Sequence, residues 1–325
     1  MNPLAKLIAP RLPSAAVGLS AEGVGVVKLD RRRDLFVVQR AGYLPLRGGL
    51  VRPSFDEPNL EAPAELAAAL SELTATTGLG KRRRWSATLP EAATRTSILT
   101  MESAPASRHE AEEMLRWKTE RALGAPPDEL RVSRERLPPD AQGRARYLVA
   151  AVRLSVLAEY EAVFGGLGWQ AGLILPRHMG EAWWLMRDGA RSLGDSLLVS
   201  GHADGFTAVI LRAGQPLYVR VVSCEPEDRA DELFRFLLFY RDRHAPASAA
   251  GDIEAAPAAP TDTIGRLLVA GTGVAEAEAA AIVEETLSVP PRPVRADDLR
   301  LSFPEAGIEF EQLAAPAGLA ALAWA

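Results

Sequence analysis

The sequence predicts an α/β fold built of two lobes, and three observations lead to that prediction. Strand-like stretches alternate with helix-like stretches along the chain, which is typical of α/β architectures. The chain has 325 residues, more than the roughly 100–200 residues of one ordinary domain. A plan of hydrophobic strand, small or polar turn and hydrophobic strand occurs twice, at Val17–Arg40 and at Leu197–Val222. The repeat predicts two related halves whose hairpins face each other across a cleft.

The first lobe is expected over residues 1–95. VGLSAEGVGVVKLD, at Val17–Asp30, alternates apolar with small residues, and its glycines fit a tight hairpin. The next stretches with strand or helix character are strands at Leu35–Arg40 and Ala41–Leu46, a helix at Ala64–Leu79 and a strand at Trp85–Leu89.

An inserted α/β subdomain is expected over residues 96–169. Its elements are a strand at Ser97–Met101, a helix at Arg108–Leu123, strands at Leu130–Leu137 and Arg146–Arg153, and a helix at Leu154–Leu167. Ser107 is placed to cap the first of these helices, with Glu110 three residues on. Gly124 and the two prolines that follow it end that helix.

The remainder is expected to return to the first lobe over 170–196, to form the second lobe over 197–309 and to close with a helix over 310–325. The expected elements are a strand at Gln170–Leu175 and helices at Pro176–Met186, Asp228–Arg243 and Glu276–Leu287, with a buried strand at Arg266–Ala270. The alanine- and proline-rich stretch Ala245–Thr261 is expected to be a flexible loop.

Four motifs in this order carry a resemblance to a known family. They are VGLSAEGVGVVKL, LLVSGHADGFTAVILRAGQPLYVR, LLVAGTGV and AAPAGLAALA. They resemble the first phosphate hairpin, second phosphate hairpin, adenosine turn and closing helix of the actin/FtsA superfamily, and the layout is most similar to PilM-type pilus assembly proteins. The resemblance implies a two-lobed actin-like fold (a duplicated ribonuclease H-like fold) with an inserted FtsA/PilM-type α/β subdomain.

The cofactor that this resemblance implies is ATP with Mg²⁺, held by the two hairpin turns and the glycine-rich turn. The candidate nucleotide-cleft residues are Ser20, Glu22, Gly23, Ser200, Gly201, His202, Gly271, Thr272 and Gly273.

The motifs depart from the family pattern where its chemistry resides. Ser20 and Ser200 stand where the family has aspartates, and Val27 stands at the family lysine, with Lys28 displaced by one position. A serine hydroxyl cannot hold a hydrated divalent cation as a carboxylate does, and Glu22 would repel a phosphate. We therefore expect a degenerate site without ATP hydrolysis, and we assign no catalytic residue and no metal ligand.

Composition limits the other possibilities. A formal net charge of -5 does not favour nucleic acid as a partner. The single cysteine, Cys224, cannot form an internal disulfide and fits a reducing compartment, and no window approaches the roughly 18 apolar residues of a membrane helix. We expect a cytoplasmic protein that meets the inner membrane only through a partner. The basic runs Arg31–Arg33 and Lys81–Arg84 are expected to be solvated, with contact to an anionic surface left open.

By resemblance, the expected function is that of a cytoplasmic scaffold in a type IV pilus assembly platform. PilM-type proteins bind the N-terminal tail of the single-span membrane protein PilN in a groove between the first lobe and the inserted subdomain, here the units Val17–Leu89 and Ser97–Gly168, and they contact other components of the pilus machinery.

Two alternatives remain open. An active actin-like ATPase or small-molecule kinase would need a carboxylate for magnesium, and only Glu22 and Asp204 are at hand. A GspL-like cytoplasmic domain of a type II secretion system would be expected to continue into a membrane helix, whereas this chain ends at Trp324-Ala325.

Overall fold

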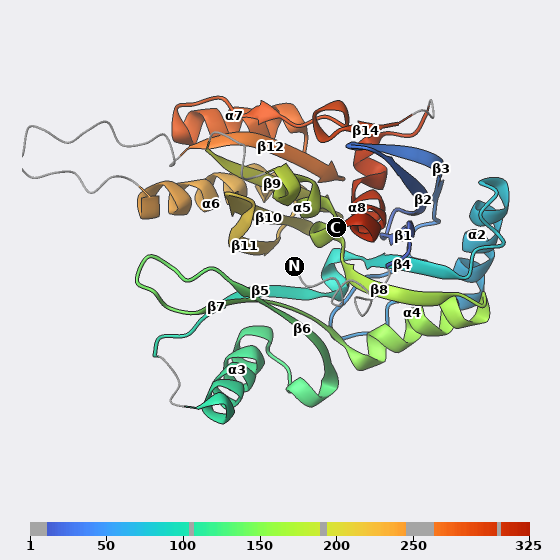
Figure 1. The fold of residues 1–325 in the computed structure, drawn as a ribbon, viewed down its shortest axis with the longest axis horizontal. Helices are drawn as coiled ribbons and strands as arrows, with labels where there is room; N and C mark the ends of the chain where they lie inside the picture. The colour runs from blue at the N-terminus through green and yellow to red at the C-terminus, as the bar shows by residue number, and fades with distance from the viewer. Residues whose placement is uncertain (1–11, 104–106, 189–193, 245–262, 304–306) are drawn as a thin grey trace, which may run out of the picture.

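A computed structural model describes residues 12–103, 107–188, 194–244, 263–303 and 307–325 of the chain. Two large β-sheets form the body of the molecule, and a third, smaller sheet lies beside them (Figure 1). The expected two-lobed α/β fold is confirmed. Among the described residues, no helix has both the length and the apolarity to cross a bilayer.

The first lobe is built on a six-stranded sheet of order β14-β3-β2-β1-β4-β8. Strands β1, β2 and β3 form an antiparallel meander, and β4 and β8 continue it in parallel with β1. The bounds are β1 Ala15–Leu19, β2 Gly23–Arg32, β3 Leu35–Pro45, β4 Arg84–Leu89, β8 Gln170–Pro176 and β14 Leu301–Ser302. Two strands were expected in this region, but β3 runs through it without a break. A β-bulge at Gln39 interrupts the alternation of the side chains, so the sequence pattern divides there.

The second lobe repeats this plan on a five-stranded sheet of order β11-β10-β9-β12-β13. Strands β9, β10 and β11 again form an antiparallel meander, and β12 pairs in parallel with β9 as β4 pairs with β1. The bounds are β9 Asp195–His202, β10 Gly205–Arg212, β11 Gln215–Ser223, β12 Ile264–Gly271 and β13 Arg292–Pro293. The internal repetition read from the sequence is therefore a repetition of the strand topology.

Two helices, α5 (Arg177–Asp188) and α8 (Phe310–Ala321), lie between the two sheets and join the lobes through one shared apolar core (Figure 1). They cross with their backbones in contact, because a Cβ atom on Gly318 would overlap the carbonyl oxygen of Gly180. Trp184 is buried at this crossing and donates its indole N–H to the carbonyl of Ala314 at 2.9 Å. The crossing fixes the floor of the interlobe cleft.

Further helices cover the outer faces. Helices α6 (Arg229–His244) and α7 (Glu276–Leu287) cover the second sheet. On the first sheet, α2 (Pro63–Thr76) packs with α4 (Leu154–Gly166) over the core that contains Val24, Val26 and Trp85. Helix α4 was expected within the inserted block 96–169. It belongs instead to the first lobe, because its buried face, including Tyr160, packs on the first-lobe core.

The inserted subdomain therefore consists of β5 (Arg95–Thr100), α3 (Arg108–Leu123), β6 (Leu130–Leu137) and β7 (Arg146–Arg153), in a sheet of order β5-β7-β6. Ser107 caps α3 as expected, since its hydroxyl accepts from the backbone N–H of Glu110 at 3.1 Å. Within the range 197–309 expected for the second lobe, β14 instead extends the first sheet by pairing with β3. The expected loop Ala245–Thr261 falls almost wholly outside the described residues.

Candidate functional site

Three turns meet at the mouth of the cleft between the lobes. They are the β1–β2 turn at 20–23, the β9–β10 turn at 202–205 and the glycine-rich turn at 271–273 that follows β12. Thr272, in the glycine-rich turn, contacts both hairpins. Its N–H donates to the carbonyl of Gly201 at 3.1 Å, and its hydroxyl donates to the carboxylate of Glu22 at 3.2 Å. The structure thus brings the expected cleft residues together, while their role in binding a nucleotide stays a prediction.

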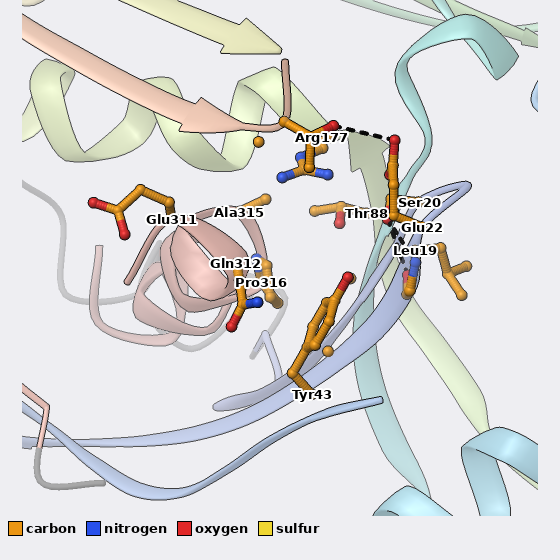
Figure 2. A pocket seen from close by; sticks show the side chains of 15 residues that line it. Leu19, Ser20, Glu22, Tyr43, Thr88, Arg177, Glu311, Gln312, Ala315 and Pro316 are labelled. Carbon is orange, nitrogen blue, oxygen red and sulfur yellow. Dashed lines mark hydrogen bonds between the residues drawn. The ribbon is translucent and has the colours of Figure 1, made fainter. Parts of the chain in front are cut away.

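The first turn is closed by its own serine. The hydroxyl of Ser20 accepts from the N–H of Gly23 and donates to the carbonyl of Gly23, both at 3.1 Å. Tyr43 points from β3 toward this turn (Figure 2), and a Cβ atom on Gly23 would overlap its hydroxyl. Burial, with the nearby charge of Glu22, raises the pKa of Tyr43. The hydroxyl of Ser20 therefore stabilises its own turn.

The family lysine position has no cation facing the cleft. Val27 packs in the interlobe core, and Lys28 lies on the opposite face of β2 because successive side chains of a strand alternate. The displacement by one residue that the sequence showed therefore removes the lysine from the cleft.

The second turn is held from behind by an arginine. The guanidinium of Arg229, which is 8% exposed, donates to the carbonyls of Gly273 at 2.7 Å, His202 at 3.0 Å and Ala203 at 2.6 Å. A Cβ atom on Gly273 would overlap this guanidinium. Arg229 therefore covers the surface of the turn that the resemblance assigned to a nucleoside. Sequence reasoning missed it, because the only signal was a basic residue at the start of an amphipathic helix.

Close backbone packing explains the glycines of this lobe. A Cβ atom on Gly201 would overlap the carbonyl oxygen of Thr272, and one on Gly271, whose φ is +82°, would overlap that of Gly201. Ser200 is buried, and no hydrogen-bond partner for its hydroxyl lies in the described parts of the chain. These small residues allow two loops to touch and leave the position of the family aspartate without a charge.

A buried polar cluster lies beneath the turns, where α5 meets both lobes. His178 donates from Nδ1 to Glu91 at 2.6 Å, and Arg177 donates from Nε to Glu181 at 2.8 Å. Burial raises the pKa of Glu91, but the charge and hydrogen bond of His178 outweigh this and hold the pKa below its usual value. Burial lowers the pKa of His202, which lies nearby, and the charges of Glu91 and Asp204 oppose this only in part.

No local sequence signal predicts that these groups lie together. His178, His202 and Glu91 come from separate segments of the chain. The one local signal at Glu91 is a charged residue two positions after the buried strand β4.

The space that remains in the cleft is small. A cavity of about 60 Å³ lies between Ser20, Tyr43, Arg177, Thr272 and Pro316. Small-molecule pockets commonly measure about 300–1,000 Å³, so this cavity has room for a few water molecules. Within the described residues, no three acidic, histidine or cysteine side chains are grouped as metal ligands. In this conformation the residues of the cleft do not fit a magnesium–nucleotide complex.

Comparisons with known proteins give one strong likeness. No protein-family model and no curated protein sequence matches the chain. Among solved structures, a chain of the PilM–PilN type IV pilus biogenesis complex matches with a TM-score of 0.74 and 19% identity, over 97% of this chain and 99% of that chain.

Two more distant structures have TM-scores below 0.5 and carry no argument. A Bacteroides thetaiotaomicron protein with an actin-like ATPase fold and unknown function matches at 0.48, with 11% identity over 97% of this chain and 98% of its own. The cytoplasmic domain of EpsL, an inner membrane component of the Vibrio cholerae type II secretion system, matches at 0.43, with 11% identity over 86% of this chain and 96% of its own. The chain has the two-lobed α/β fold found in a chain of the PilM–PilN complex, over nearly the full length of both chains.

Proposed function

We propose that this protein is a scaffold of a type IV pilus assembly platform that binds the N-terminal tail of a PilN-like membrane protein and does not hydrolyse ATP. One observation carries the proposal: the match to the PilM–PilN complex extends over nearly the full length of both chains. Such a protein works at the cytoplasmic face of the inner membrane, where it meets the bilayer through its partner and contacts other pilus components.

The state of the cleft supports a role without catalysis. The turns of the chain itself already form hydrogen bonds with the polar groups of Arg229, Thr272 and Ser20. A catalytic cleft instead needs preorganised groups that stay free for the reacting phosphate and its metal. Because these hydrogen bonds are already made within the protein, they stabilise the closed lobes. A ligand would therefore gain few new hydrogen bonds in the cleft.

The joint between the first lobe and the inserted subdomain is built to hold its shape. Phe55 projects from a first-lobe loop into the core of the inserted subdomain. The guanidinium of Arg95 lies over the Phe55 ring, 4.1 Å from the ring centroid. Asp56 accepts from Arg95 at 3.1 Å and from Arg153 at 2.7 Å. A tail bound along such a joint would lose little free energy to reorganisation, because the two walls are already fixed.

The test is calorimetric titration of the full chain with a synthetic peptide copying the tail of the PilN-like protein of the same organism, with and without Mg-ATP. We expect saturable micromolar binding that nucleotide does not change, and no binding of a scrambled peptide. Tighter binding with Mg-ATP would show that the cleft still regulates the partner. Turnover of ATP with no peptide binding would replace the scaffold proposal by the enzyme alternative, and Glu22→Gln and Asp204→Asn would then locate the metal.

A further inference from the structure

A basic hollow lies on the outer side of the first lobe, away from the cleft. It measures about 320 Å³, between the β2–β3 hairpin and the loop that follows α2. Its lining includes four cationic side chains and two others, namely Lys28, Arg40, Lys81, Arg82, Gln39 and Leu79. The hollow falls within the usual size range of small-molecule pockets, and it carries concentrated positive charge on a protein whose formal net charge is -5.

The β-bulge of β3 places two of these cations opposite each other. Lys28 pairs with Arg40 across the strands, whereas the next pair is Leu29 with Val38, so Gln39 is the extra residue. Like charges directly opposite each other destabilise a strand pair. This arrangement has a cost in the free protein that a bound anion would remove.

No carboxylate offsets the four charges. Within the described residues, Lys28, Arg40, Lys81 and Arg82 form no ion pair, and none of the lining residues is acidic. Elsewhere in the described residues many cations have carboxylate partners; Arg47 lies 2.8 Å from Glu65, and Lys118 lies 3.8 Å from Glu102. The basic hollow therefore gathers four cationic side chains in one place without an ion pair among the described residues.

Capping of α2 does not explain the cations. Basic residues often follow a helix because its last carbonyls carry partial negative charge. Here the carbonyls of Leu73, Thr74 and Ala75 already accept from the backbone N–H groups of Thr77, Leu79 and Gly78. Within the described residues, the lysine and arginine side chains of the hollow donate to none of these carbonyls, and Arg40 donates instead to the carbonyl of Gln39.

We infer that the basic hollow binds a phosphate group. A tetrahedral dianion accepts several hydrogen bonds, and ammonium and guanidinium groups are its usual protein donors. Lys28, which is half-buried on β2, and Lys81, which is exposed on the loop after α2, supply charge from two separate segments. A soluble phosphate compound and the headgroup of an anionic phospholipid share this chemistry.

The test uses two probes on the full chain: inorganic phosphate, followed by calorimetry, and vesicles of phosphatidylglycerol in phosphatidylcholine, followed by co-sedimentation. The site variant is Lys81→Gln with Arg82→Gln. Its control is Arg32→Gln with Arg136→Gln, which removes the same charge from exposed arginines that do not line the hollow. We expect saturable binding of at least one probe, about tenfold weaker in the site variant and within about twofold in the control.

The two sources are told apart by competition. Saturable phosphate binding without vesicle binding identifies a soluble ligand, and vesicle binding displaced by inorganic phosphate identifies a headgroup. Failure of both probes to saturate, or equal weakening by the site and control variants, overturns the inference.

A second variant separates a loss of phosphate binding from a loss of folding. Lys28→Gln removes one member of the opposed pair, so it should raise the melting temperature of the free protein while weakening phosphate binding. A variant that lowers both the melting temperature and the affinity would contradict the role assigned to Lys28.

Discussion

The two hairpins at the cleft share a strand plan and differ in what holds their turns. The β1–β2 turn is closed from within by the hydroxyl of Ser20. The β9–β10 turn is held from outside by Arg229, which arrives from helix α6 and reaches two carbonyls of the turn and one of the glycine-rich turn. The same hairpin backbone is therefore stabilised by local hydrogen bonds in the first lobe and by a side chain distant in sequence in the second lobe. The second copy should be the more sensitive to substitution.

The largest effect is expected from Arg229→Met. The change leaves three carbonyls without their cationic donor, and hydrogen bonds to a charged group contribute about 1.5–3 kcal/mol each. We expect a loss of about 4 kcal/mol in the free energy of unfolding, measured by urea denaturation. Arg235→Met is the control, since Arg235 pairs with Glu232 on the exposed face of the same helix and should cost less than about 1 kcal/mol. Similar losses in both variants would mean that the turn does not depend on Arg229.

Alanine at a glycine in each hairpin compares the two copies directly. Gly201→Ala drives a Cβ atom into the backbone of Thr272, which has little freedom to move, and should cost about 3 kcal/mol. Gly23→Ala meets mainly the hydroxyl end of the Tyr43 side chain, which can turn aside, and should cost about half of that. Thermal denaturation of both variants beside Gly48→Ala, which has open space around it, tests the order.

Acid should weaken the second hairpin through His202. Its folded-state pKa lies below the value of about 6.5 for a free histidine, so below that pH the unfolded chain binds more protons and stability falls as pH decreases. Between pH 7 and pH 5 we expect a loss of about 1 kcal/mol from this group. In His202→Gln that part of the pH dependence should vanish. An unchanged slope would assign the acid sensitivity to another group.

The smallest effect is expected where the hairpins are tied together. The hydrogen bond from Thr272 to Glu22 is exposed to solvent. A double-mutant cycle of Thr272→Val and Glu22→Gln should therefore give a coupling of about 0.5 kcal/mol. A coupling above about 2 kcal/mol would show that this contact holds the lobes closed.

The sequence predicted the fold well where local signals are strong. The expected bounds of α3, α7, β6 and β7 match the structure, because a cap at Ser107, a glycine at 124 and regular alternation mark the ends. Helix α4 was expected in the inserted subdomain, and its buried face packs on the first-lobe core. An amphipathic pattern shows that one face is buried but does not show which core it joins.

The site was harder to predict than the fold. The sequence has serines at 20 and 200 where the family has aspartates, and the effect of these serines on nucleotide binding stays a prediction. Glu22 was expected to face a phosphate, and the structure shows it accepting from Thr272, a partner 250 residues away. Arg229 and Glu91 were missed for the same reason: their roles arise from contacts between distant segments, which no local spacing encodes.

The crossing of α5 and α8 limits how the lobes can move. Gly180 and Gly318 bring the two helix backbones into direct contact, with no side chains between them. Sliding one helix along the other would therefore make the two backbones clash. The lobes are left with rotation about that contact as their easy motion. The two lobes are therefore expected to rotate about a fixed helix–helix contact. A methyl group added at either glycine would push α5 and α8 apart and so displace both lobes.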